Sequence, residues 1–144
     1  MTEVFFYILE ADGADALERF ACRLTEKAHE GGHRVYLHAA DADQVARLDK
    51  LLWIFRQGSF VPHCAVEALA ADDRLTPVTI GSGAPPAGFD DVLINVGGDA
   101  SGFFSRFGRH NELVPPAAVA GARSLYRFYK DRGYALTTHK IAAS

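Results

Sequence analysis

Two glycine-containing turns, each following an apolar run, are the first candidates for chemistry. Gly81-Ser82-Gly83 is placed like a phosphate-binding loop, but Ala84-Pro85-Pro86-Ala87 adds no third glycine and opens no predicted helix. Gly97-Gly98-Asp99 lies where α/β folds often bind ligands, at the carboxyl end of a strand, yet it does not match a Walker A sequence. We expect neither turn to bind a nucleotide. A small α/β nucleotide- or cofactor-binding enzyme that uses Gly97-Gly98-Asp99 is the alternative function.

Thiol and imidazole groups offer little more. Cys22, His29 and His33 could approach one another near a helix end, but zinc needs three or four ligands and Gly31-Gly32 separates His33 from the helix. His63-Cys64 resembles a base and a nucleophile, but adjacent side chains rarely point at each other and no orienting group is identifiable. Both cysteines lie among apolar residues, which predicts buried thiols. We therefore expect no catalytic residue, no metal site and no cofactor.

Apolar runs alternate with helical patterns along the chain. Three helices are predicted: from a cap at Asp12 or Asp15 to Gly31-Gly32, from near Asp41 or Asp43 to Gly58, and from Pro115-Pro116 to about Arg132 with Gly133 as the cap. Strands are predicted at residues 4–9, 34–39, 77–80, 91–96 and 134–139, with a brief one at 113–114. This order predicts an α/β fold in which helices cover both faces of a mostly parallel sheet.

Composition bounds the class of protein. The chain has 144 residues, 49% hydrophobic and 23% charged, as expected of one ordered domain spanning residues 1–144. Residues 106–144 hold seven basic and two acidic side chains, whereas residues 1–105 hold eight basic and sixteen acidic ones. An acidic partner for the carboxy-terminal part is one interpretation, and a merely solvated basic helix face is the other. The amino-terminal apolar run is broken by Glu10 and Asp12, so we expect a cytoplasmic protein without membrane contact.

Two segments place unusual side chains outside the predicted core. In residues 48–63, Trp53, Phe60 and Val61 surround a helix end and a loop that Pro62 stiffens. Rigid aromatic rings of this kind are typical anchors of protein interfaces, although a satellite core beneath the loop is the alternative. In residues 122–134, basic residues recur at helical spacings of four and three and form one stripe: Arg123, Arg127 and Lys130.

At these segments the sequence resembles the chi subunit family of bacterial DNA polymerase III, an accessory of the clamp loader. The first likeness is Leu48-Asp49 and Leu52-Trp53 ahead of Ser59-Phe60-Val61-Pro62-His63. The second comprises Arg123, Tyr126 to Tyr129, Gly133, Leu136, Thr138 and Lys140. Phe6-Tyr7, Leu9 and Arg47 extend the resemblance over nearly the whole chain, and residues 65–90 match least.

The resemblance implies a Rossmann-like domain without enzymatic activity that connects proteins during DNA replication. It implies binding of the psi subunit through Trp53, Phe60, Val61, Pro62 and His63. It also implies binding of the acidic carboxy-terminal tail of single-stranded-DNA-binding protein through Arg123, Arg127, Lys130, Tyr126 and Val119. The clamp loader would be reached indirectly, through psi, and no specific contact with nucleic acid is expected.

One position departs from the family pattern. Val119 stands where family members carry a second basic residue, one helical turn before the arginine matched by Arg123. Two alternatives follow. Either Arg127 or Lys130 compensates for the missing charge, or the affinity for the tail is lower.

Overall fold

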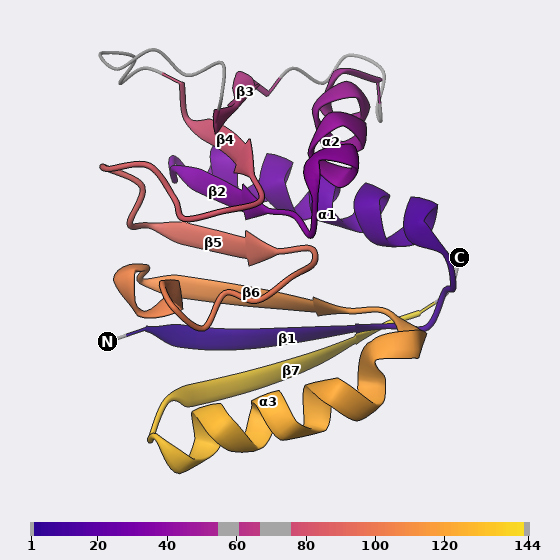
Figure 1. The fold of residues 1–144 in the computed structure, drawn as a ribbon, viewed down its shortest axis with the longest axis vertical. Coiled ribbons are helices and arrows are strands. Elements are labelled where there is room, and N and C mark those ends of the chain that lie inside the picture. The colour runs from indigo at the N-terminus through magenta and orange to yellow at the C-terminus, as the bar shows by residue number, and fades with distance from the viewer. Residues whose placement is uncertain (1, 55–60, 67–75, 143–144) are drawn as a thin grey trace.

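A computed structural model describes residues 2–54, 61–66 and 76–142, which form a three-layer α/β fold (Figure 1). Its sheet has the strand order β3-β4-β2-β5-β6-β1-β7, and every pairing is parallel. The strands are β1 (Glu3–Leu9), β2 (Val35–His38), β3 (His63–Ala65), β4 (Val78–Gly81), β5 (Val92–Asn95), β6 (Arg109–Val114) and β7 (Ala135–Ile141). The predicted α/β class is thus confirmed.

In the described part of the chain, three α-helices cover the sheet. They are α1 (Ala14–Glu30), α2 (Ala42–Ile54) and α3 (Val119–Asp131), and short 3-10 turns lie at η2 (Phe104–Arg106) and η3 (Pro116–Ala118). The helices α1 and α2 pack into one hydrophobic cluster and α3 into another, so they lie on opposite faces of the sheet (Figure 1). Within the described ranges no helix has the length and hydrophobicity to span a membrane.

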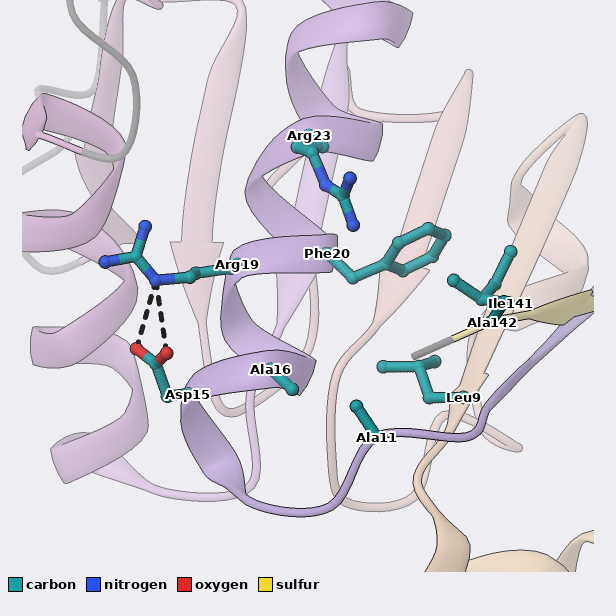
Figure 2. A pocket seen from close by; sticks show the side chains of 9 residues that line it. All are labelled: Leu9, Ala11, Asp15, Ala16, Arg19, Phe20, Arg23, Ile141 and Ala142. Atoms are coloured by element: carbon teal, nitrogen blue, oxygen red, sulfur yellow. Dashed lines mark hydrogen bonds and ion pairs between the residues drawn. The ribbon is translucent and has the colours of Figure 1, made fainter. Parts of the chain in front are cut away.

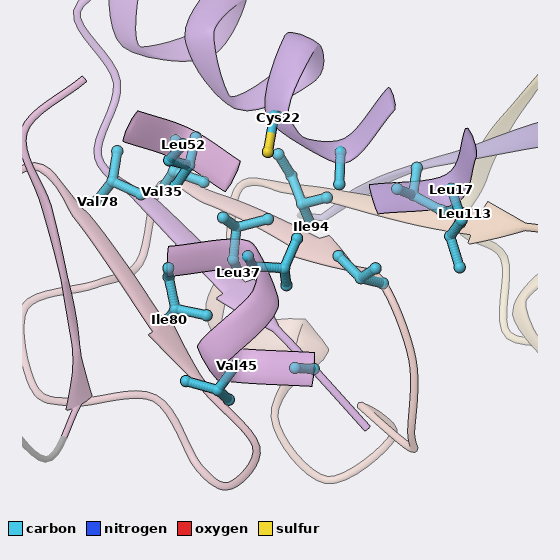
Figure 3. Packing of buried hydrophobic residues seen from close by; sticks show 14 of the residues in the cluster. Leu17, Cys22, Val35, Leu37, Val45, Leu52, Val78, Ile80, Ile94 and Leu113 are labelled. Carbon is cyan, nitrogen blue, oxygen red and sulfur yellow. The ribbon is translucent and has the colours of Figure 1, made fainter. Parts of the chain in front are cut away.

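The central strands are buried from both sides, which explains their continuous apolar runs. All four residues of β2, β4 and β5 are buried. On the face of α1 and α2, Leu37, Ile80 and Ile94 project from these strands toward the helices (Figure 3). Burial of side chains of this size is the main stabilising contribution to the fold, at about 1.5–3 kcal/mol for each.

The opposite face is covered partly by irregular segments. There α3 contributes Tyr129, which is buried against Phe6 of β1. Nearer the middle of the sheet, Tyr36 and Leu93 pack instead with aromatic rings from loops and turns, namely Phe89, Phe104 and Phe107. On this part of the sheet, aromatic side chains from loops and turns therefore provide the covering layer that a helix provides elsewhere.

A buried carboxylate joins α1 to α2. Glu18 is almost fully buried and accepts hydrogen bonds from Arg47 Nε at 3.0 Å and Arg47 Nη2 at 2.9 Å. Gln44 Nε2 donates a third at 3.2 Å. The bond from Glu18 also raises the pKa of the Arg47 guanidinium. Because a buried charge is costly without partners, the bonds from Arg47 and Gln44 to Glu18 fix how α1 and α2 pack against each other.

The helix starts confirm one predicted cap and correct another. Asp41 caps α2, since its Oδ1 accepts the Gln44 N–H at 2.8 Å. The prediction of an Asp12 or Asp15 cap for α1 was wrong, because Gly13 holds the cap position without a side-chain hydrogen bond. Asp15 instead accepts from Arg19 Nε, one turn further along the helix. The predicted end of α2 at Phe55 to Gly58 lies outside the described residues.

Strand and helix bounds in the second half differ more from the prediction. β3 was missed, and β6 has six residues where only Leu113-Val114 was predicted. The chain after Pro115 first makes the turn η3, so α3 starts only at Val119. Gly133 ends α3 as predicted, with a φ of 82° and its N–H donating to Lys130 O at 3.0 Å.

A side chain at Gly81 should destabilise the fold, whereas one at Gly83, two positions away, should not. A Cβ at Gly81 would meet Val66 Cγ2 at 2.6 Å and the Tyr36 hydroxyl at 2.8 Å, whereas one at Gly83 meets nothing within 4 Å. We expect Gly81→Ala to lower the free energy of unfolding by about 1–3 kcal/mol and Gly83→Ala by less than about 0.5 kcal/mol. Urea denaturation measures both, and equal effects would contradict the packing around Tyr36.

Candidate protein-binding surfaces

The carboxyl end of α2 exposes two large apolar side chains. Trp53 is 53% exposed and Ile54 is 63% exposed. They project outward because Val45, Leu48 and Leu52 already form the buried face of the helix. Exposed apolar neighbours of this size are typical of protein contacts. Ile54 was missed in the sequence, although its place directly after Trp53 puts it beyond the buried stripe.

A buried imidazole supports Trp53 from beneath. His63 Nδ1 lies 2.6 Å from Val61 O, and its Nε2 lies 2.9 Å from Asp49 O and 3.3 Å from Asp49 Oδ1. Both ring nitrogens thus lie within hydrogen-bond distance of oxygen atoms of the chain. The Trp53 ring centroid is 4.6 Å from that of His63. This clamp joins the end of α2 to the start of β3 and orients the indole.

The predicted psi-binding residues divide into three groups. Trp53 reaches the surface, and Pro62, which precedes His63 in the chain, is partly exposed. Val61 is only 1% exposed and His63 is buried, so these two side chains belong to the support of the surface rather than to its outer layer. Phe60 lies outside the described residues.

The outer face of α3 is basic. Arg123, Arg127 and Lys130 are all exposed and lie within one angular sector of the helix, as their spacings of four and three predicted. Among the described residues none of the three forms an ion pair. Their charges are therefore available to an anionic ligand.

An apolar rim borders this basic face. Tyr126 is 37% exposed, and its ring lies 5.4 Å from Phe6, measured between centroids. Val119 and Ala122 are half-buried one helical turn from Arg123. The structure thus brings together all five predicted residues of the tail-binding surface, with the cations outermost and the apolar side chains next to the sheet.

The glycine turns considered for chemistry are packed against the core. A Cβ at Gly97 would lie 2.9 Å from both Ala40 Cβ and Gln44 Oε1, so this turn closes against the start of α2. Asp99 accepts the Ser101 N–H at 2.8 Å, and this bond lowers the pKa of its carboxyl group.

A buried polar network that the sequence did not reveal lies near the carboxyl ends of β2, β5 and β6. Asn95 Nδ2 donates to Glu112 Oε1 at 2.7 Å, and Asn95 Oδ1 lies 2.9 Å from His38 Nδ1. Glu112 Oε2 lies 2.8 Å from His110 Nε2, which the Tyr129 hydroxyl approaches at 3.2 Å. Burial raises the pKa of Tyr129. The network joins α3 to the middle of the sheet.

The thiols and imidazoles proposed for chemistry do not form a site. Cys22 is buried in the core, and burial together with Glu18 raises the pKa of its thiol to about 12. His33 Nδ1 is 2.8 Å from Asp91 Oδ2. Cys64 is only partly buried, which corrects the prediction of two buried thiols. In the described part of the chain no group of three or more His, Cys, Asp or Glu residues could hold a metal ion.

The sequence matches a known family over most of its length. The family described as DNA polymerase III chi subunit, HolC, matches residues 1–137. A relative from Pseudomonas aeruginosa named DNA polymerase III subunit chi is 43% identical over 143 residues, which cover 98% of each chain. The protein of the same name from Escherichia coli is 28% identical over 147 residues, covering 96% of this chain and 97% of the relative.

Solved structures with a similar fold include helicase domains. T4 UvsW aligns with a TM-score of 0.68 at 6% identity, over 98% of this chain and 42% of that one. The DEAD-box helicase domain 2 of Mss116p, bound to an RNA duplex, aligns with a TM-score of 0.65 at 10% identity, over 99% of this chain and 65% of that one. At such identities the similarity concerns the fold alone.

The contacts of His63 predict that two neighbouring rings contribute very differently to the free energy of unfolding. His63→Ala leaves Val61 O and Asp49 O without their donor and empties a buried site, so we expect a loss of about 2–4 kcal/mol in the free energy of unfolding. Trp53→Ala should cost less than about 1 kcal/mol, because half of the indole is already in water. Thermal and urea unfolding measure both. A larger loss for Trp53→Ala would place the indole in the core.

Proposed function

The chain belongs to the family of the chi subunit of DNA polymerase III, and from this premise we propose that it is a non-catalytic adaptor within the polymerase complex. It joins the psi subunit, and through psi the clamp loader, to the acidic tail of single-stranded-DNA-binding protein. One observation carries the proposal: the exposed apolar corner at the end of α2 and the basic outer face of α3 lie on opposite faces of one sheet. Two partners can therefore bind at once.

The apolar corner fits a stable subunit contact. Trp53 and Ile54 offer adjacent apolar surface, and the hydrogen bonds of His63 hold the support of the indole in place before any partner arrives. Preorganised aromatic anchors lose little conformational entropy on binding, which favours a long-lived complex.

The basic face of α3 fits an acidic peptide that ends in a carboxylate. Arg123 can hold a terminal carboxylate with two parallel hydrogen bonds, and Arg127 and Lys130 attract further acidic groups. Tyr126, Val119 and Ala122 offer apolar contact beside Arg123, where a side chain of the peptide can pack. Charge provides attraction, and the apolar rim provides selectivity.

Replacement of the exposed indole tests the psi surface. Trp53→Ala should weaken binding of psi about thirtyfold or more, which corresponds to about 2 kcal/mol for truncation of an interface aromatic. Co-expression with tagged psi, followed by calorimetry on the purified chains, measures the loss. Tyr126→Ala is the matched control, since it removes an exposed ring from the other face. Unchanged affinity of folded Trp53→Ala protein would refute the surface.

Charge reversal tests the tail surface. Arg123→Glu should weaken binding of a peptide with the sequence of that tail by about tenfold or more, because it replaces an attraction with a repulsion. Arg106→Glu changes the net charge equally at an exposed position outside α3 and should leave the affinity unaltered. Calorimetry with rising salt adds a second readout, since exposed charges are screened beyond about 8 Å at physiological ionic strength. Equal affinities of the Arg123→Glu and wild-type proteins would contradict the assignment.

A further inference from the structure

A groove with no role in the proposed function runs along α1. It consists of three adjoining hollows of about 380, 440 and 480 Å³. The first and middle hollows share Phe20, Arg23 and Ile141, and the middle and last share Tyr7, Lys27 and Arg109. The groove is therefore continuous, with α1 as one wall and the strands β1, β6 and β7 opposite. Figure 2 shows the first hollow, between α1 and the ends of β1 and β7.

Basic side chains line the middle of this α1 groove. Arg23 and Lys27 lie one helical turn apart on α1, and Arg109 extends from β6. No aspartate or glutamate is among the residues that line the middle hollow. Three acidic groups line the outer hollows: Asp15 accepts from Arg19 (Figure 2), Asp91 pairs with His33, and Glu3 is exposed and in register with Arg109. The centre of the groove is therefore basic, with one unpaired carboxylate, that of Glu3, near one end among the described residues.

The strand side of the groove presents aromatic rings that already pack on one another. His139 of β7 stacks on Tyr7 at 5.2 Å and on Phe5 at 6.3 Å, measured between centroids. The Arg109 guanidinium lies 3.8 Å from the centroid of Phe5, and its Nη2 donates to the Tyr7 hydroxyl at 3.0 Å. Arg23 lies 5.6 Å from the ring centroid of Phe20. These contacts hold the basic groups in place and occupy the ring faces.

The groove ends at an open sheet edge. β7 is the last strand in the sheet order and pairs with β1 alone, so the groups on its outer edge face away from the sheet. Five of its seven residues are exposed. An edge strand of this length is a template for a further strand. Thr137, His139 and Ile141 are in register with Phe5, Tyr7 and Leu9, which places them on the groove side.

We propose that the α1 groove and the edge of β7 together bind an extended acidic segment of a partner protein, which adds to the sheet as an eighth strand. The seven residues of β7 match a segment of about the same length, roughly 23 Å when extended. Because side chains alternate along a strand, acidic groups at every second position would all lie on the side of the sheet where Arg23, Lys27 and Arg109 create a positive potential. The site lies on the opposite face of the sheet from α3.

Two other occupants fit less well. A nucleic acid strand would need free ring faces for its bases, but Phe5, Tyr7 and Phe20 are already stacked or covered. If a second copy of this chain paired edge to edge through β7, Lys140 and His139 of one copy would lie close to the same residues of the other. Basic groups would then face basic groups. Only an acidic strand satisfies both the charge of the groove and the backbone of the edge.

A ten-residue peptide of alternating Asp and Val, labelled with fluorescein, is the probe. It should bind with saturable anisotropy, and the outward amides of residues 135–141 should become protected from hydrogen exchange by about tenfold or more. Lys27→Glu and Arg23→Glu should each weaken binding about fivefold to tenfold. Lys50→Glu, the same change as Lys27→Glu at an exposed position of α2, should not.

Further arms separate the alternatives. The same peptide with alternate residues N-methylated keeps its charge but cannot pair with β7, and equal binding of it would refute strand addition. Tighter binding of a twenty-nucleotide oligothymidylate, lost in Lys27→Glu, would overturn the proposal in favour of nucleic acid, and dimers in light scattering would overturn it in favour of a second copy. Arg123→Glu should leave protection of β7 unchanged, so failure here and failure of the tail surface are distinguishable.

Discussion

The structure depends on one constraint: within the described residues, an all-parallel sheet of seven strands is covered on both faces by three α-helices. On one face α1 and α2 bury the central strands, and Glu18 with Arg47 fixes their packing. On the other face α3 covers the side near β1, and phenylalanines from irregular segments cover the middle. On the side opposite α3, α1 covers β1 and β7 incompletely, and this is where the α1 groove lies.

The turn after β5 packs closely on its surroundings at the position where such folds often bind ligands. In open α/β sheets, ligands bind outside the carboxyl ends of the strands. Here Gly97 packs on Ala40 and Gln44, and the side chains of His38, Asn95 and Glu112 bond to one another beneath it. These polar side chains join the strands to one another and, through His110 and Tyr129, to α3.

The sequence predicted the fold where burial alone decides the residue type. The strands β1, β2, β4 and β5 are mostly apolar, so their runs were visible, and α1 and α2 were visible from their periodicity. Most of β6 was hidden, because His110, Asn111 and Glu112 are polar residues that only tertiary hydrogen bonds make compatible with burial. The strand β3 was missed because three residues are too few to show the alternation that marks a strand. Spacing within one helix is local information, so it placed Arg123, Arg127 and Lys130 correctly on one face. The support of Trp53 by His63 depends on a contact between α2 and β3, which the sequence alone does not reveal.

Strand alternation keeps the two basic surfaces independent. In β1, Phe6 faces α3 and packs with Tyr126, whereas the next residue, Tyr7, faces the α1 groove and packs with His139. Side chains of neighbouring residues point to opposite faces, so a ligand on one surface neither touches nor covers the other. The sheet lies between them, and groups separated by a packed layer of about 10 Å contribute almost additively to binding. If both surfaces bind their proposed partners, the affinity of each is set by its own side chains, and a change in one leaves the other intact as long as β1 keeps its register.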